Sequence, residues 1–373
     1  MSEQLIAGRP LDIVILCQQQ FGSHIDTYYY SKYLSASHRV TYICWDYGSA
    51  RLDPGKVTVK HVSRTFNLVV RNLLYLYFVC AHLHRHPFDV CFIKYFRGCS
   101  ILRLLFPRAN FIFDIRTGSV SKSRFSRFLF DTTMKVESFF FPQVTVISRS
   151  LGRRLGLEKK ARILPIGSIP LSTEVKDFQG LHLVYAGTLS NRNIDRTLEP
   201  FTTFVRNHSH ELSISYTIIG SGPGNEEEVL RSRVKELGMT GKIHIVGRVP
   251  FDKLGQYFDK CNVGVSFVPM TDFFDVQPAT KTFDYLLSGM AVIATATSEN
   301  KLVITENNGV LIEDTAEGFH LGLEKILARR TTYRSAAIMA DAMRYHQDNY
   351  SRDLEQMMLE QAGCAVNGCI SAG

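Results

Sequence analysis

The sequence has little of what marks a membrane-spanning, disulfide-bonded or zinc-binding chain. Its longest strongly apolar run, residues 73–83, is too short to cross a bilayer. The eight cysteines are scattered, with no Cys-x-x-Cys pair and no zinc-ligand spacing, so we expect reduced thiols in a cytoplasmic protein. The first residues lack a basic segment followed by an apolar core, so no secretory signal is expected.

The composition is that of a well-packed globular protein. Hydrophobic residues make up 45% of the chain and charged residues 21%. A chain of 373 residues exceeds what one hydrophobic core usually serves, so two domains are expected. The net charge of +8 is unevenly placed, because residues 1–165 are strongly basic and the remainder is net acidic. The two halves therefore face different partners.

The basic half interleaves charge with aromatic residues. Residues 122–130 read Lys-Ser-Arg-Phe-Ser-Arg-Phe-Leu-Phe, and on a helix Phe125, Phe128 and Leu129 share one face beside Lys122. Such a face suits an anionic membrane surface or nucleic acid, but no nucleic-acid-binding motif accompanies it. We predict peripheral association with the inner face of a membrane and no nucleic-acid partner. Burial of the apolar stripe against the domain's own sheet is the alternative.

Short apolar runs alternate with helical segments throughout the chain, which is typical of doubly wound, Rossmann-like α/β domains. In a first domain, residues 1–165, we predict strands at residues 11–16, 40–45, 90–93, 110–113, 144–148 and 161–164. Residues 67–84 are expected to form a largely buried helix.

A linker is predicted at residues 166–180, which are rich in proline, glycine and polar residues. Alternation then resumes in a second Rossmann-like domain, residues 181–331. Residues 332–361 form a helical segment that we expect to pack back on the first domain, and residues 362–373 form a tail. The chain is thus an α/β protein with an interdomain cleft, and ligands in such sheets bind beyond the carboxyl ends of the strands.

Four turns of the second domain follow directly on predicted strands. They contain Gly187 and Thr188, Gly220 and Gly222, Val246 with Gly247 and Arg248, and the segment 277–289. Glycines there let the backbone approach a ligand closely. Arg192, just after the first turn, adds positive charge for a phosphate.

The segment 277–289 places Lys281 and Asp284 three residues apart at the start of a helix. Pro278 suits the first helical turn, and Gly289 suits the position just past the end. The free N–H groups around Thr280 favour an anion, and a lysine on the same face strengthens the site. We therefore predict that Lys281 and Arg192 bind phosphate; an ordinary surface Lys–Asp pair is the alternative.

These turns resemble the donor-binding half of retaining GT-B glycosyltransferases. The similarity is to the large family 4-like group (group 1) that transfers mannose, glucose, N-acetylhexosamines and related sugars from nucleoside diphosphates. It covers residues 183–330 well and the first domain only loosely. It rests on residues 185–189, 220–223, 246–250 and 278–289, with Ser148 and residues 163–167 as weaker elements.

The resemblance implies a role for several residues. Lys281 matches the family's phosphate-binding lysine, and Asp284 stands where a carboxylate, usually glutamate, holds the ribose hydroxyls. Val246 and Gly247 match the turn whose backbone meets the nucleobase. Gly187 and Thr188 match the turn beneath the diphosphate.

The chain also departs from this pattern. Many members carry a second glutamate where this chain has Val276. Asp272 and Asp275 are close in sequence, and we take Asp275 as a candidate to contact donor sugar or acceptor in the cleft. A basic residue often stands at the position of Thr188, which leaves Arg192 as its replacement.

In the first domain, members of the family commonly have a histidine at the end of a strand where this chain has residues 113–118. We take Asp114 and Arg116 there as contacts to donor or acceptor, with Arg116 joining Lys281 and Arg192 as a catalytic candidate. Asp114 as a helix cap is the alternative. Gly22 and His24 are cleft candidates, although a lone histidine is more often structural.

The reaction implied is transfer of a hexosyl group from a UDP- or GDP-sugar to an acceptor hydroxyl, on a glycan or lipid-linked glycan, with retention. No Asp-x-Asp triplet occurs in the sequence, so we expect no metal and no cofactor; the helix start, Lys281 and Arg192 would stabilise the leaving diphosphate. A sugar-nucleotide epimerase or phosphorylase of related fold is one alternative. A catalytically inactive scaffold that docks on membranes or partners is another.

Overall fold

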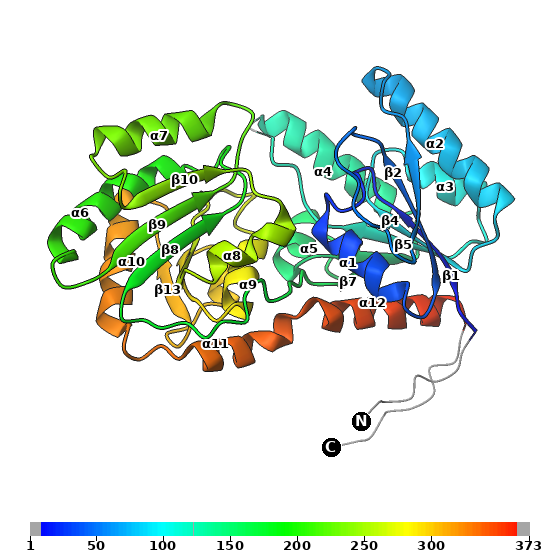
Figure 1. Ribbon diagram of the computed structural model, residues 1–373. Coiled ribbons are helices and arrows are strands. Elements are labelled where there is room, and N and C mark those ends of the chain that lie inside the picture. The colour runs from blue at the N-terminus through cyan, green and yellow to red at the C-terminus, as the bar shows by residue number, and fades with distance from the viewer. Residues whose placement is uncertain (1–8, 122, 364–373) are drawn as a thin grey trace. The chain divides into compact units, whose positions relative to one another are not determined.

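The computed structural model describes residues 9–121 and 123–363, which form two compact units (Figure 1). The first unit runs to Ile166 and resumes at Gln347, and the second is Gly167–His346. Lys122 and most of the predicted tail lie outside the described residues. No helix within the described ranges is long and apolar enough to cross a membrane.

The first unit contains, in its described residues, a seven-stranded parallel sheet of order β3-β2-β1-β4-β5-β6-β7. Its strands are β1 Asp12–Leu16, β2 Arg39–Trp45, β3 Thr58–Val62, β4 Val90–Lys94, β5 Phe111–Ile115, β6 Gln143–Val146 and β7 Ala161–Ile163. The order reverses between β1 and β4, which makes their carboxyl ends a topological switch point. The edge strand β3 was not predicted, because Lys60 and His61 interrupt its apolar character.

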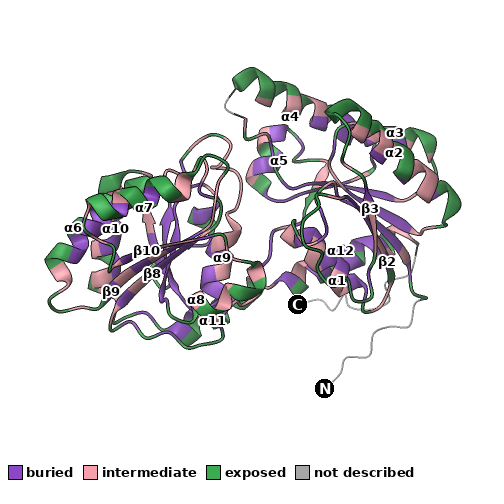
Figure 2. Cartoon of the chain, turned by 45° about the horizontal axis from the view of Figure 1, so that its top comes forward, coloured by how far each residue is buried: buried purple, intermediate pink, exposed green. Residues whose placement is uncertain are grey.

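Helices cover both faces of this sheet. They are α1 Ile25–Leu34, α2 Leu68–Arg85, α3 Ser100–Leu105, α4 Arg124–Ser138, α5 Arg149–Leu155 and α12 Gln347–Gln361. Right-handed crossovers place α1 on one face and α2, α3, α4 and α5 on the other. Figure 2 shows α2, α3 and α4 on the side of the sheet away from α1 and α12.

The C-terminal helix α12 packs on α1 and completes the core of the first unit. Leu354 and Met358 are buried in that core with Tyr30. His38 Nε2 lies 2.9 Å from Glu355 Oε1 and ties the helix to the start of β2. The predicted helical segment 332–361 is in fact broken into α11 Ser335–Ala342, a short 3-10 turn at Met343–Tyr345 and α12. Of these, α11 packs on α9 of the second unit.

The second unit contains, as far as it is described, a six-stranded parallel sheet of order β10-β9-β8-β11-β12-β13. Its strands are β8 Leu181–Ala186, β9 Ile214–Ile219, β10 Ile243–Gly247, β11 Val263–Ser266, β12 Ala291–Thr295 and β13 Gly309–Ile312. Its further helices are α6 Leu198–His208, α7 Glu226–Glu236, α8 Gly255–Phe258, α9 Thr280–Leu287 and α10 Ala316–Arg329. Short 3-10 turns occupy Ile194–Thr197, Phe251–Lys253 and Asn300–Leu302. The prediction of two Rossmann-like α/β domains is confirmed.

One prediction about the first unit is wrong. Residues 67–84 do form a helix, α2, but it is not largely buried. Only Tyr75, Val79 and Leu83 are buried in it, because a helix that covers a single sheet face buries one narrow stripe.

Candidate active site

Three glycine turns lie side by side at the carboxyl edge of the second sheet. Gly187 follows β8, Gly220 follows β9 and Gly247 ends β10. The Gly187 N–H donates to Ile219 O (3.0 Å) and the Gly220 N–H donates to Gly247 O (2.8 Å). The turns therefore extend the sheet past its strands as a connected strip of backbone.

Glycine is required where two of these turns meet. Gly187 and Gly220 have φ of 147° and 143°, which L side chains rarely adopt. A Cβ built on Gly220 would lie 1.8 Å from Gly187 O. The close approach leaves the peptide groups of both turns, rather than side chains, at the edge of the sheet.

Helix α9 begins opposite these turns. It starts at Thr280 with Ala279 as its N-cap, so Pro278 precedes the cap rather than lying in the first helical turn. Gly289 lies just past the helix end in the left-handed region, as predicted. The Tyr285 hydroxyl accepts a hydrogen bond from Ala186 N–H at 2.8 Å, which fixes α9 against the end of β8.

Lys281 projects from the first turn of α9 toward the Gly187 turn. Its Nζ lies 3.7 Å from the centroid of the Tyr185 ring, and a Cβ built on Gly187 would be 3.1 Å from it. The Nζ is covered and has no hydrogen-bond partner among the described residues. Burial, with the charge of Arg192, holds the pKa of Lys281 well below its usual range, although Asp284 acts in the opposite direction.

Arg192 supplies a second cation to the same region. Its guanidinium carbon lies 4.2 Å from the centroid of the Phe274 ring, in a cation–π arrangement. Burial lowers the pKa of Arg192, but an arginine keeps its charge in proteins. The structure thus places both predicted phosphate-binding cations in the second unit, and the charge of Arg192 adds to burial in lowering the pKa of Lys281.

Asp284 lies one turn along α9 from Lys281 and is partly exposed. It accepts a hydrogen bond from the Ser168 hydroxyl. Asp275, a candidate for contact with acceptor or donor sugar, instead accepts hydrogen bonds from the Ser298 N–H (2.8 Å) and hydroxyl (2.6 Å). That geometry gives Asp275 a role in fixing the loop after β12.

The remaining predicted donor residues line the same edge. Thr188 and Arg248 are exposed, and Gly222, Val246 and Thr280 are partly exposed. The aromatic residues that hold the site together, Tyr185, Phe274 and Tyr285, were missed by the sequence reasoning. The signal that could have found Tyr285 is its spacing of four residues from Lys281, which puts both on adjacent turns of one helix.

Arg116 and Asp114 occupy a buried network in the first unit, not an open site. Arg116 Nε donates to Asp114 Oδ2 (2.7 Å), Nη1 to Leu164 O (3.0 Å) and Nη2 to the Tyr30 hydroxyl (2.7 Å). Asp114 also accepts from the Thr145 hydroxyl at 2.6 Å. Both side chains are almost completely buried. The geometry favours a structural role over the catalytic and ligand-binding roles predicted for them.

His24 and Gly22 follow β1 at the carboxyl edge of the first sheet. His24 is the N-cap residue of α1, and burial, with the charges of Lys94 and Arg116, holds its pKa well below the usual range. Gly22 has φ of 86°, and a Cβ there would lie 2.3 Å from Leu52 Cδ1. Gly22 therefore packs beneath the loop after β2.

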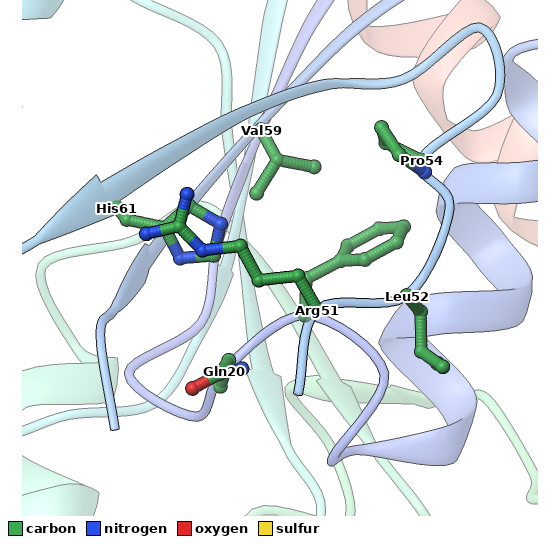
Figure 3. Close-up of a pocket in the computed structure, with 7 residues that line it drawn as sticks. Gln20, Arg51, Leu52, Pro54, Val59 and His61 are labelled. Carbon is green, nitrogen blue, oxygen red and sulfur yellow. The ribbon is translucent and has the colours of Figure 1, made fainter. Parts of the chain in front are cut away.

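That loop forms part of the wall of a pocket of about 210 Å³ in the first unit. Its lining residues are Gln20, Phe21, Arg51, Leu52, Pro54, Val59 and His61. In Figure 3, the Arg51 side chain extends across the pocket toward His61 of β3. Burial and the nearby Arg51 charge lower the pKa of His61, so a neutral imidazole and a cation face this space together.

In the part of the chain that the structure describes, no group of three or more His, Cys, Asp or Glu side chains is arranged to hold a metal ion.

Two parallel α/β domains, with glycine turns at the carboxyl edge of the second sheet, have the architecture of the GT-B fold. Residues 177–343 match the family model described as glycosyl transferases group 1. This match covers most of the second unit, and the predicted resemblance to this family is confirmed.

Solved structures agree on the fold. Sucrose-phosphate synthase from Thermosynechococcus elongatus is 16% identical with a TM-score of 0.72, over 95% of this chain and 99% of that one. HepE from Anabaena, in complex with UDP, is 12% identical with a TM-score of 0.73, over 94% of this chain and 100% of that one. WaaG, a glycosyltransferase involved in lipopolysaccharide biosynthesis, is 14% identical with a TM-score of 0.64, over 95% and 100%. No relative was found among curated protein sequences.

Proposed function

We propose that this glycosyltransferase takes a UDP- or GDP-sugar as donor and transfers the hexosyl group, with retention, to a hydroxyl of a glycan or lipid-linked glycan. One observation carries the donor proposal: the covered Nζ of Lys281, without a hydrogen-bond partner among the described residues, beside the Gly187 turn. A buried ammonium without a partner is costly, and a diphosphate would supply the missing counter-charge. The complexes of HepE with UDP and with UDP-glucose support the same class of donor.

In this proposal, each group has one task. The peptide groups of the Gly187 and Gly220 turns approach the diphosphate, and Lys281 with Arg192 neutralises the charge that builds on it as the glycosidic bond breaks. Asp284 holds the ribose hydroxyls, and the turn at Val246 and Gly247 meets the base. The acceptor belongs to the first unit, where the pocket beneath the 46–57 loop offers polar and apolar walls.

The donor class is tested by thermal unfolding with UDP, GDP and ADP. A ligand at 100 times its dissociation constant stabilises the folded state by about 2.7 kcal/mol, which is easily measured. We expect UDP or GDP to raise the unfolding temperature and ADP to do so less. Equal or absent shifts with all three nucleotides would contradict the donor site. Sugar transfer or slow donor hydrolysis then separates an enzyme from an inactive scaffold.

Metal independence is the second expectation. Lys281, Arg192 and the start of α9 together supply positive charge where a diphosphate would lie, so no divalent cation is required to balance it. Activity should survive excess EDTA. Complete loss in EDTA, restored by magnesium or manganese but not by calcium, would overturn the expectation.

We also propose that the protein works at the inner face of a membrane as a peripheral protein. The support is the predicted stripe on α4, where Phe125, Phe128 and Leu129 are all exposed. The alternative, burial of that stripe against the sheet, is therefore wrong.

A further inference from the structure

Helix α2 presents apolar side chains to solvent along its first three turns. Tyr75, Val79 and Leu83 form its single buried stripe, and the Tyr75 hydroxyl anchors it by donating to Ile43 O at 2.9 Å. A helix that only covers a sheet carries polar residues on its outer side. Instead, Leu73 and Tyr77 are 61% and 70% exposed.

This surface continues onto the neighbouring helices. Because α2, α3 and α4 are successive crossovers on one face of a parallel sheet, each begins at the carboxyl edge of that sheet. Figure 2 shows exposed residues along the outer sides of these helices. The exposed apolar residues are Phe66, Leu68, Val69, Leu73 and Tyr77 at α2, Leu104 and Leu105 on α3, and Phe125, Phe128 and Leu129 on α4. We call these residues the apolar face. Patches of this extent mark interaction sites.

The charges around the apolar face are mostly positive. Residues 54–138, which run from before α2 to the end of α4, contain 14 lysines and arginines and four acidic residues, Asp89, Asp114, Asp131 and Glu137. Asp114 is buried with Arg116 and Glu137 is also buried, while Asp89 pairs with Arg9 and Asp131 with Arg154. The surface of this segment therefore keeps a clear excess of positive charge. This face therefore has both apolar side chains that could insert into a lipid layer and a positive charge that attracts anions.

These features point to one occupant. A symmetric contact between two copies would set this cationic surface against itself, because a two-fold interface brings the same patch together from both subunits. A lipid surface with anionic headgroups matches both the charge and the apolar side chains, since interfacial helices bury an apolar face among headgroups that attract Lys and Arg.

We propose that α2, together with the first turns of α4, docks the protein on an anionic lipid surface. The inference rests on the peripheral membrane localisation proposed above and deepens it, by assigning the contact mainly to a helix that the sequence did not indicate. The carboxyl edge of the first sheet, where α2 and α4 begin, would then lie close to the lipid. A lipid-linked acceptor would be presented at that edge.

The test is cosedimentation of the full chain with phosphatidylcholine vesicles, with and without phosphatidylglycerol. The docking variant carries Leu68→Gln, Leu73→Gln and Tyr77→Gln, all at exposed positions. The matched control carries Val229→Gln and Leu302→Gln, which are equally exposed in the second unit. We expect about tenfold or more weaker partitioning of the docking variant onto anionic vesicles, since each apolar side chain buried contributes favourably. The control should bind like wild type, and binding should weaken with added salt.

Several results would overturn the proposal. If the docking variant binds anionic vesicles as well as wild type, α2 is not the docking element, although the membrane localisation stands. If wild type binds neither vesicle while UDP or GDP still stabilises it, the localisation fails together with α2 docking, and the donor proposal is untouched. Self-association that the docking variant abolishes, without lipid binding, would identify a second copy as the occupant. Circular dichroism checks folding, and Leu73→Gln alone, expected to bind severalfold more weakly, replaces a triple variant that misfolds.

Discussion

Replacing Lys281 by alanine should lower kcat for sugar transfer roughly a hundredfold or more, as expected for removal of a group that stabilises a developing anion. The Nζ lies covered beside Tyr185 and the Gly187 turn, without a hydrogen-bond partner among the described residues. Its charge is therefore best satisfied when the departing diphosphate gains negative charge. Steady-state kinetics with the nucleotide sugar identified by thermal unfolding measures the effect.

Asp284→Asn is the matched control on the same face of α9. Ribose hydroxyls change little during the reaction, so this variant should mainly raise the donor KM and leave kcat nearly unchanged. If both variants keep near-normal kinetics in a folded protein, α9 is ordinary scaffold and the donor site lies elsewhere.

The Lys281→Met variant tests whether Lys281 destabilises the unliganded fold while it is required for activity. Burial holds the pKa of Lys281 well below its usual range, so the unfolded chain binds this proton more tightly than the folded one. The unfolding free energy of the unliganded wild type should thus rise with pH between the lowered folded pKa and the unfolded pKa. Lys281→Met should lack this contribution and unfold at a higher temperature than wild type without ligand, while losing activity. A less stable methionine variant would show that the lysine is satisfied within the fold.

Arg116→Ala should destabilise the protein by about 3–5 kcal/mol, because it leaves the buried carboxylates of Asp114 and Asp26 without their partner. The Arg116 side chain is 2% exposed, Nε is 2.7 Å from Asp114 and Nη1 is 3.5 Å from Asp26. Burial alone would lower the pKa of Arg116, but the neighbouring Asp114, Tyr30 and Asp26 raise it overall. Denaturant unfolding measures the loss.

The pH dependence provides a second readout for the same variant. Burial raises the pKa of Asp26, and Arg116 opposes that rise. Without Arg116 the folded pKa should climb further, so the unfolding free energy of the variant should fall more steeply as pH rises from acid toward the raised pKa. Arg39→Ala is the control: Arg39 pairs with Asp12 at the surface, where loss of a pair typically changes stability by about 0–1 kcal/mol. Equal stability of the two variants would contradict a structural role for Arg116.

The strand and turn pattern of the second unit was readable in the sequence, because parallel strands buried on both sides appear as short apolar runs and their turns need glycine. The position of Lys281 at a helix start was readable for the same reason, since Gly289 and the apolar strands on either side delimit α9. The covered Nζ was not readable, because it depends on Tyr185 and Gly187, nearly a hundred positions earlier in the chain.

The first unit shows where local pattern misleads. Asp114 and Arg116 follow a strand just as ligand-binding residues do, yet Tyr30, Thr145 and the Leu164 carbonyl enclose them. The apolar composition of residues 67–84 indicated burial, but the neighbours of α2 cover only one stripe of it.

The sequence by itself determined the α/β class, the two Rossmann-like domains and the family of the second, because periodicity, turn residues and motif spacing are local properties. Only the tertiary structure decided which charged residues are enclosed, which apolar residues face solvent and where α12 packs. Those outcomes depend on which distant segments cover a side chain. Burial by segments far away in the sequence cannot be recognised from the residues adjacent to that side chain.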